Sequence, residues 1–362
     1  MELLNDLAGY TAAFGAEDIS SNAMKRAVGE WFSLYYDRED LMQLPYTIVR
    51  KLVRSVFAEH KLEGLEAWPG QNALEMALIG GESFLKPVRV EGVWQWRVIP
   101  RGSILVFGRN WDGEPTDVGL MERTLKGRSY FTLLERRKVG ADGLLTVTNR
   151  LFRSANRREL GREVKLSEQP LYGDLPERYT YPLPLGVGLV RLKLPVANCV
   201  DGSREGVSIY AAAQPLLRAI AENEAQLQGE FRKGQSRLVV SRDMLRGNQL
   251  TDELFVGLDE SPENVGITIF APELREQSYL ARQQAYLRSV EHVIGLKRGL
   301  LSQVEAEDRT ATEITSSEGE YMTLIWELRR AVEEAAIRCA GLLDIMDGQQ
   351  RQVEVSWGDG IL

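Results

Sequence analysis

The residues that could do chemistry are few, and their spacing forms no recognisable catalytic centre. The chain has two histidines, His60 and His292, which we interpret as surface or hydrogen-bonded residues rather than as metal ligands. No cysteine and histidine cluster has the spacing of a zinc site, and no serine lies in a Gly-x-Ser-x-Gly turn. The sequence therefore predicts neither a metal site nor a nucleophilic hydrolase, and we expect a protein that is not an enzyme.

Two glycine patterns partly match nucleotide-binding sites. Residues 229–236, GEFRKGQS, have the glycine spacing of a phosphate-binding loop, but Gln235 stands where the essential lysine belongs. The segment also follows a predicted helix rather than a strand. The pair Gly186 and Gly188 lacks the third glycine and the following helix of a dinucleotide-binding turn. Neither pattern predicts a cofactor, and none is expected.

The remaining residues that could react are two acidic pairs and the two cysteines. Glu305 with Glu307, or Glu333 with Glu334, could act as catalytic or metal-binding carboxylates, but solvated faces are the simpler interpretation. The two cysteines, Cys199 and Cys339, lie in apolar surroundings. We interpret both as buried thiols of a protein from a reducing compartment.

The charge of the chain is unevenly distributed. The 362 residues are 44% apolar and 27% charged, with a net charge of −8. Residues 80–170 carry 17 basic and 11 acidic side chains, whereas the rest of the chain is net acidic. We interpret this segment as the basic outer face of a sheet, with contact to nucleic acid or to an acidic partner as the alternative. No run of about 18 uncharged apolar residues predicts a membrane helix.

Helices and an antiparallel β region are predicted for the first half of the chain. Apolar residues at helical spacing predict helices at 20–36, 45–57 and 70–79, the first capped by Ser20 or Ser21. Alternating residues between 81 and 170 predict antiparallel strands, with hairpins at Gly92 and at residues 140–143. Residues 170–188 are expected to be a loop crossing.

The second half is dominated by helices. Residues 206–233 and 279–294 show helical periodicity, and short strands are predicted between them. The apolar stripe predicted for the first of these helices consists of Leu216, Ile220, Leu227 and Phe231. The longest pattern extends from Thr310 to Met346 and predicts a helix of about 55 Å. A helix of this length requires packing partners along its whole length. The end of the chain, QVEVSWGDGIL, predicts a strand.

These segments, in this order, resemble the portal proteins of tailed bacteriophages, most closely the siphophage type from phages of Gram-positive bacteria. The similar segments include AVGEWFSLYYDRE, SYFTLLERRKV, GVSIYAAAQPLLRAIAENEAQLQGEFRKGQSRLVVSRDML, ITIFAPELREQSYLARQQAYLRSVEHVIGLKRGLLS and RTATEITSSEGEYMTLIWELRRAVEEAA. The Thr-Ala-Thr-Glu opening of the long helix is typical of that group.

The resemblance implies an α+β, portal-like fold. Its expected parts are a wing at 1–205 with helices and then antiparallel strands at 81–170, a first stem helix at 206–233, a small α/β clip at 234–277, a second stem helix at 278–295, a channel (tunnel) loop at 296–309, a long wing-crossing helix at 310–346 and a return strand at 347–362. Portal proteins usually continue into a helical crown, which is expected to be missing here.

The resemblance also implies the function and the partners. Portal subunits form a ring, of twelve subunits in that family, at the capsid vertex, through which double-stranded DNA is packaged and ejected. The expected partners are the terminase large subunit, a head-completion (adaptor) protein, the major capsid protein and a scaffolding protein. We expect the chain in the virion, and in the host cytoplasm during assembly, with no membrane contact.

Three groups of residues follow from these assignments. The expected channel-facing residues of the stem are Arg218, Glu222, Glu224, Glu230, Arg232 and Lys233. Those of the channel loop are Lys297, Arg298, Glu305, Glu307, Asp308 and Arg309. Those of the partner-binding clip are Arg237, Arg242, Arg246, Asp252 and Glu253. A mixed or acidic wall allows DNA to slide, because it avoids the strong binding that a basic wall produces through counterion release.

Two alternatives stay open at the level of the sequence. The first is a connector ring of a gene-transfer agent or of another phage-derived particle, which would share every feature above. The second is a nucleic-acid-processing enzyme that uses the basic region at 80–170.

Overall fold

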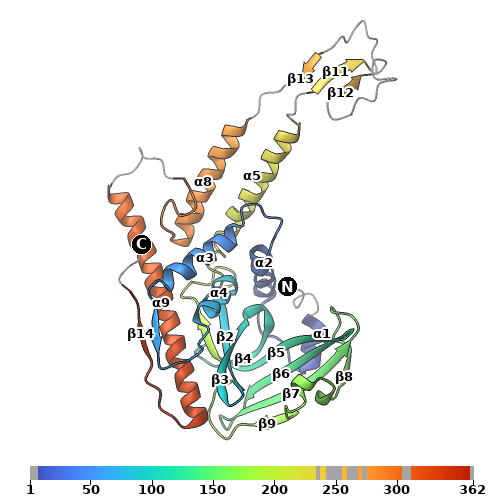
Figure 1. The fold of residues 1–362 in the computed structure, drawn as a ribbon, viewed down its shortest axis with the longest axis vertical. Coiled ribbons are helices and arrows are strands. Elements are labelled where there is room, and N and C mark those ends of the chain that lie inside the picture. Colours follow the sequence, from blue (N-terminus) through green and yellow to red (C-terminus); the bar gives the residue numbers. More distant parts are fainter. Residues whose placement is uncertain are drawn as a thin grey trace. The chain divides into compact units, whose positions relative to one another are not determined.

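The computed structural model describes residues 7–233, 237–241, 255–258, 268–270, 275–303 and 311–358. These residues form a mixed α+β fold, as expected (Figure 1). The chain divides into two units by its internal contacts. One consists of Met1–Ala212 with Glu318–Leu362, and the other of Ala213–Ser317.

The first unit begins with helices α1 (Leu7–Phe14), α2 (Asn22–Tyr35), α3 (Leu44–Val56) and α4 (Gly70–Gly80). The last three are the helices predicted at 20–36, 45–57 and 70–79. The hydroxyl of Ser21 accepts the backbone N–H of Met24 at 3.1 Å and caps α2, which confirms one of the two predicted caps. Gly81 ends α4 in the left-handed conformation, with φ at 84°.

The strands of the first unit form antiparallel sheets, which confirms the β region predicted at 81–170. The largest is a six-stranded sheet with the order β4-β5-β6-β7-β8, in which β9 also pairs with β7. A three-stranded sheet has the order β10-β2-β3. The bounds are β2 Glu82–Val90, β3 Val93–Pro100, β4 Ile104–Arg109, β5 Pro115–Lys126, β6 Ser129–Val139, β7 Leu145–Ser154, β8 Arg162–Val164, β9 Arg178–Thr180 and β10 Val190–Lys193.

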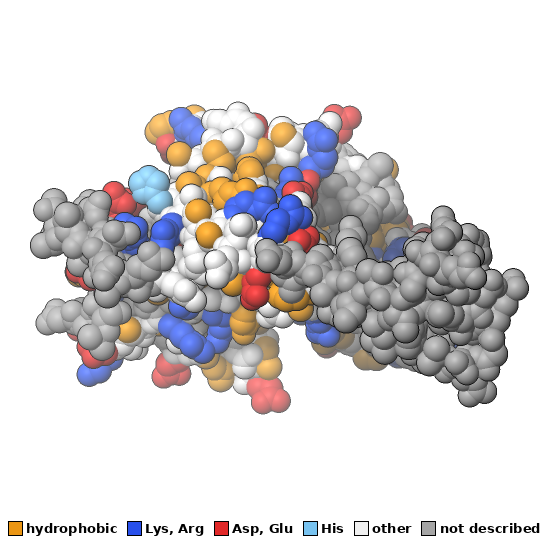
Figure 2. All heavy atoms as spheres, turned by 90° about the horizontal axis from the view of Figure 1, so that it is seen from above, with side chains coloured by type: hydrophobic (Ala, Val, Ile, Leu, Met, Phe, Trp, Pro, Cys, Tyr) orange, Lys and Arg blue, Asp and Glu red, His pale blue; other side chains and the backbone are white. Residues whose placement is uncertain are grey.

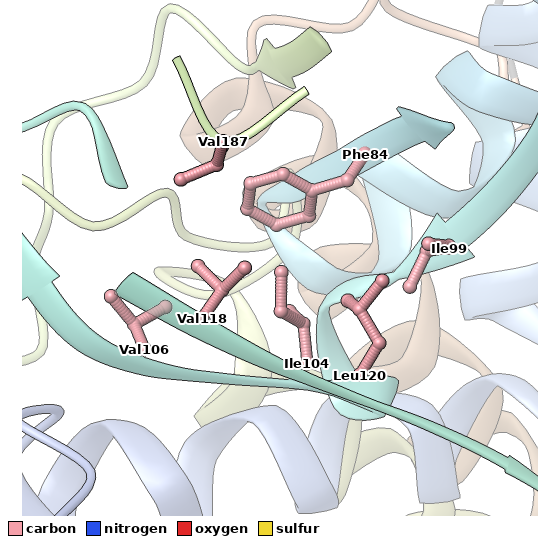
Figure 3. Packing of buried hydrophobic residues seen from close by; sticks show 7 residues of the cluster. All are labelled: Phe84, Ile99, Ile104, Val106, Val118, Leu120 and Val187. Carbon is pink, nitrogen blue, oxygen red and sulfur yellow. The ribbon is translucent and has the colours of Figure 1, made fainter. Parts of the chain in front are cut away.

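Both predicted hairpins are present, and the sheets that contain them pack on each other. Val90 pairs with Val93 around Gly92, and Val139 pairs with Leu145 around residues 140–143. Strands β2 and β3 meet β4 and β5 through a buried apolar cluster, and Figure 3 shows these side chains converging. Its members are Phe84, Ile99, Ile104, Val106, Val118, Leu120 and Val187.

The helix predicted at 206–233 begins later than expected. α5 covers Gln214–Lys233, and residues 206–213 are not helical. Gly206 lies so close to Gly81 that a Cβ atom on it would come within 2.3 Å of the Gly81 carbonyl oxygen. The backbone N–H of Ile209 donates to the carbonyl of Leu78 at 3.0 Å. The segment therefore binds α4 instead of forming a helical turn, and the expected start at Gly206 is wrong.

The long helix is present as one element. α9 runs from Ala311 to Asp347, 37 residues, which confirms the helix predicted at 310–346 to within one residue at each end. Its buried face within the first unit follows the predicted stripe and comprises Tyr321, Ile325, Leu328, Val332, Ala335, Ala336, Cys339, Leu342 and Leu343. The hydroxyl of Tyr321 donates to Ser55 of α3 at 2.7 Å.

A short strand returns the chain to the first unit. β14 (Glu354–Ser356) pairs antiparallel with β1 (Lys61–Glu63), within the range where a final strand was predicted. Arg329 of α9 contacts Trp357, the residue that follows this strand. Its guanidinium lies 5.3 Å from the centre of the Trp357 ring, and its Nε donates to the carbonyl of Val56 at 3.3 Å.

The second unit contains two helices with strands between them in the sequence. α5 is followed by β11 (Arg237–Ser241), β12 (Phe255–Leu258) and β13 (Thr268–Phe270), and then by α8 (Glu276–Ile294). The three strands form one sheet in which β11 pairs with β12 in parallel and with β13 antiparallel. α8 is the second of the two helices that the sequence predicted on either side of this segment.

Candidate functional site

The paired helices α5 and α8 pack through one narrow apolar stripe each. Leu217, Ile220 and Leu227 of α5 are buried, and so are Leu287, Val290 and Ile294 of α8. The stripe predicted for α5 is correct only in its middle, because Leu216 is half-buried and Phe231 is 42% exposed. The two helices leave their opposite faces to solvent.

A polar contact interrupts this stripe and fixes how the helices align. Asn223, 2% exposed, donates from Nδ2 to the carbonyl of Tyr279 at 3.1 Å. Its Oδ1 accepts a hydrogen bond from Nε of Arg282 at 2.6 Å. Both polar groups of the Asn223 side chain are hydrogen-bonded. Sliding α5 along α8 would leave these buried groups unpaired, which costs free energy.

The stem residues expected to face the channel do not share one face of α5. Arg218, Glu222 and Arg232 are exposed, and their spacing places them on the side opposite the buried stripe. Glu224 accepts a hydrogen bond from Gln283 at 3.3 Å, and Glu230 pairs with Arg275 at 3.1 Å. These two glutamates therefore lie on the flanks of α5 and contact α8. Lys233 ends α5, and its side chain lies outside the described residues.

The loop that follows α8 is anchored to a buried carboxylate. Glu291 is 1% exposed. It accepts the backbone N–H groups of Gly299 at 3.2 Å, Leu301 at 2.5 Å and Ser302 at 2.8 Å, and the Ser302 hydroxyl at 2.8 Å. Hydrogen bonds to an ionised carboxylate are roughly twice as strong as neutral ones. The start of the predicted channel loop is therefore a fixed structure.

Local geometry at the end of α8 brings the loop back to Glu291. Gly295 takes the left-handed conformation with φ at 79°, and Leu296 is buried behind it. The backbone N–H of Gln303 then donates to the side chain of Gln284 at 2.7 Å, so the loop runs back along the helix. Sequence reasoning missed this anchor. The available indication was an acidic residue, Glu291, directly beside Val290 in the apolar stripe.

Only part of the predicted loop and clip residues can be placed. Lys297 and Arg298 are half-buried at the base of the loop. Arg237 begins β11, but its side chain lies outside the described residues. Eight further positions also lie outside the described residues: Glu305, Glu307, Asp308 and Arg309 of the loop, and Arg242, Arg246, Asp252 and Glu253 of the clip.

A buried ionic cluster in the first unit was also missed. Glu82 is 0% exposed and lies 2.5 Å from Arg191 and 3.1 Å from Arg101. Arg101 also contacts Glu205 at 2.9 Å, and Arg109 lies within 4.0 Å of both glutamates. Burial alone would raise the pKa of Glu82, but the three arginines outweigh it and the pKa is lowered. The cluster joins β2, β4 and β10 with the segment before Gly206.

The reactive residues named from the sequence are scattered. Cys199 is exposed, so its predicted burial is wrong, whereas Cys339 is buried as expected. His60 is half-buried, with its ring centre 4.6 Å from that of Trp357, and burial lowers its pKa. Gly229 lies inside α5, so its glycine pattern begins within a helix rather than a loop.

The described residues contain neither a metal-ligand cluster nor a membrane-spanning helix. No group of three or more His, Cys, Asp or Glu side chains in that part of the chain is placed to hold a metal ion. None of the helices within the described ranges is long and apolar enough to cross a bilayer. In the comparisons with known proteins, no family model and no curated protein matches the chain.

Proposed function

We propose that the chain is a subunit of a bacteriophage portal, a ring that conducts double-stranded DNA at the capsid vertex. The observation that carries the proposal is the order of elements: a helix pair with a small sheet inserted between its members, a loop anchored at Glu291, and a single 37-residue helix. This is the order that the resemblance to portal proteins implies for stem, clip, channel loop and long helix.

The surface charge supports passage of DNA rather than tight binding. The exposed face of α5 carries Arg218 and Arg232 together with Glu222. On the face that Figure 2 views, Lys and Arg side chains lie among Asp, Glu and apolar side chains. A purely basic wall would release counterions from DNA and bind it strongly at low salt. A wall of mixed charge binds the duplex weakly, so the duplex can slide along it.

The anchor at Glu291 gives the loop a mechanical role in this proposal. A loop that contacts moving DNA must be attached rigidly to the helix that carries it. The base of this loop is fixed by the four hydrogen bonds to Glu291 and by the contact of Gln303 with Gln284. In this proposal, the loop contacts the duplex in the channel.

The remaining partners belong to the same proposal. The segment between α5 and α8, which contains the β11–β13 sheet, docks the terminase large subunit during packaging and a head-completion protein afterwards. The major capsid protein and a scaffolding protein surround the ring at the vertex. The subunit is located in the virion, and in the host cytoplasm before assembly.

Electron microscopy of the purified full chain tests the proposal. We expect closed rings with a central channel, and mass photometry should show one dominant high-mass species. A protein that stays monomeric at tens of micromolar over a range of salt and magnesium concentrations would contradict it. DNA packaging into procapsids that depends on both the rings and the terminase would extend the support from assembly to function.

A further inference from the structure

Strand β14 has little to hold it within its own sheet. Among the described residues it pairs with β1 alone, through three residue pairs. A two-stranded sheet on its own is only marginally stable in water. The pairing sets Glu63 directly opposite Glu354, and like charges in this position are destabilising. Leu62 and Val355 are only half-buried. The attachment of β14 therefore depends on contacts outside the strand pair.

The chain is fixed firmly just before β14. Arg351 pairs with Asp344 of α9 at 2.8 Å and also with Asp347. The same arginine lowers the pKa of Asp347 to about 2, so this pair stays charged under mildly acidic conditions. Gly64 has φ at 81°, and a Cβ on it would lie 1.9 Å from the carbonyl oxygen of Gln352. Residues 351 and 352 are thus attached to the first unit independently of β14.

Trp357 supplies the main contact beyond β14, and Figure 1 shows this strand beside α9. The centre of a Trp357 ring lies 4.6 Å from that of His60 and 6.1 Å from that of Phe57. The guanidinium of Arg329 lies 5.3 Å from it. The indole N–H donates to Glu333 at 3.5 Å, which is long for a hydrogen bond. The packing of this indole therefore holds the strand, with His60 in direct contact.

His60 fits this packing only as a neutral ring. Its Nε2 atom is buried and has no hydrogen-bond partner. The same is true of one guanidinium nitrogen of Arg329, a residue that is 1% exposed. Burial lowers the pKa of His60, and the positive charge of Arg329 lowers it further. A proton on His60 would add a second buried cation beside the first, which costs free energy.

The remaining charged groups near His60 do not supply a counter-ion for such a proton. Those on the elements around it are Glu59, Lys61, Glu63, Glu333 and Glu354. All but Glu333 are exposed, so solvent screens their charges. Glu333 is bonded to the indole of Trp357, and the charge of Glu59 acts on Arg329. Arg329 is therefore the charged group that decides how the site responds when His60 is protonated.

We propose that residues 353–358 form a pH-sensitive strap, which detaches from β1 and from Arg329 when His60 takes up a proton. In the attached strap the pKa of His60 lies below 6.5, and in the detached strap the ring is free to take the ordinary value. The detached state therefore binds more protons, so attachment is complete above about pH 6.5 and weakens as the pH falls through this value. The inference does not depend on the proposed portal function.

Hydrogen–deuterium exchange of the full chain tests the strap. After correction for the intrinsic effect of pH, we expect protection of the β14 amides to fall by up to about tenfold between about pH 7.5 and 5.5. This is the limit for one group with an ordinary pKa of 6.5. Amides of β6 and β7 are the internal reference and should keep their protection. Protection of β14 that stays constant, or that rises because an imidazolium is attracted to Trp357, would overturn the proposal.

The two histidines of the chain provide matched variants. His60→Phe keeps a ring against Trp357 and cannot be protonated, so β14 should stay protected at both pH values. His292→Phe makes the same change at an exposed position of α8 and should behave like the wild type. A pH dependence that persists in His60→Phe, or that disappears in His292→Phe, would assign the effect to another group and overturn the proposal.

Glu63→Gln separates the strength of the strap from its response to pH. Removing the like charge opposite Glu354 should raise protection of β14 at about pH 7.5 roughly two- to fivefold. The fall in protection toward about pH 5.5 should persist, because His60 is unchanged. A parallel rise in the protection of β6 and β7 would show that β14 opens only with the whole first unit, which would overturn the strap. Ring formation by each variant reports separately on the portal proposal.

Discussion

Ser302 binds the carboxylate of Glu291 twice, through its backbone N–H at 2.8 Å and through its hydroxyl at 2.8 Å. The two residues stand on either side of the end of α8, so the pair closes the loop between them. A carboxyl group that is 1% exposed is tolerated here because its oxygens accept four hydrogen bonds.

Loss of that carboxylate should release the loop. Glu291→Ala removes four charge-assisted hydrogen bonds, and we expect the free energy of unfolding to fall by about 2–4 kcal/mol. The amides of Gly299, Leu301 and Ser302 should exchange with deuterium much faster than in the wild type. Glu222→Gln, on the exposed face of α5, is the control and should change stability by less than about 0.5 kcal/mol. Equal amide protection in all three proteins would refute the anchor.

Two glycines with the same backbone angle should respond differently to alanine. Gly81 and Gly92 both have φ at 84°. A Cβ on Gly81 would meet the carbonyl carbon of Gly206 at 2.2 Å, whereas a Cβ on Gly92 would meet nothing within 4 Å. We expect Gly92→Ala to cost about 1 kcal/mol, and Gly81→Ala several times more because two backbones must separate. Urea midpoints measure both, and similar midpoints would contradict the close crossing.

The two thiols should differ in reactivity. Burial raises the pKa of Cys339 to about 12, and Cys199 is exposed. A thiol reagent at pH 8 should therefore modify one equivalent in the folded protein and a second only after denaturant is added. The variant Cys199→Ser should lose the fast equivalent. Rapid labelling of Cys339 in folded protein would show that α9 separates from its neighbours.

Acid should weaken the first unit through Glu135. Burial alone would raise its pKa, but Arg137 at 2.5 Å and Lys86 lower it from 4.5 to about 2. A carboxyl whose pKa is lowered by folding stabilises the protein above its unfolded pKa, and this contribution disappears as the pH falls from about 4.5 to 2. The loss is on the order of 3 kcal/mol. Denaturant titrations at stepped pH should show a shallower loss for Glu135→Gln, and identical slopes would refute the assignment.

Charge reversal in the predicted loop should change how DNA is handled. Replacing Glu305 and Glu307 with lysine should raise affinity for double-stranded DNA and hinder packaging. It should also steepen the dependence of binding on salt by up to about one unit per lysine. Glu17→Lys/Glu39→Lys makes the same change in net charge at exposed positions of the first unit. Packaging that is unaffected by the loop substitutions would remove the channel assignment.

The features that could be predicted from the sequence depend on neighbours along the chain. The cap at Ser21, the hairpin at Gly92 and the stripe of α9 each follow from residues within a few positions of one another. The pairing of β10 with β2 could not be predicted, because Val190 and Leu85 meet only in the folded chain. The start of α5 was wrong for the same reason, since contact with Gly81 decides the conformation of Gly206.

The candidate site was predictable only in outline. Periodicity locates the apolar stripes of α5 and α8, but it does not show that Glu224 and Glu230 contact the neighbouring helix. The role of Glu291 depends on backbone N–H groups, which every residue carries and which no sequence pattern marks.

The pairing of β14 with β1 sets an order of events during synthesis. Lys61–Glu63 leave the ribosome early, yet their partner Glu354–Ser356 emerges only after the whole second unit has been translated. A nascent chain therefore carries an unfinished first unit for most of its elongation. The pairing of β1 with β14 thus forms only after residues 354–356 have been made.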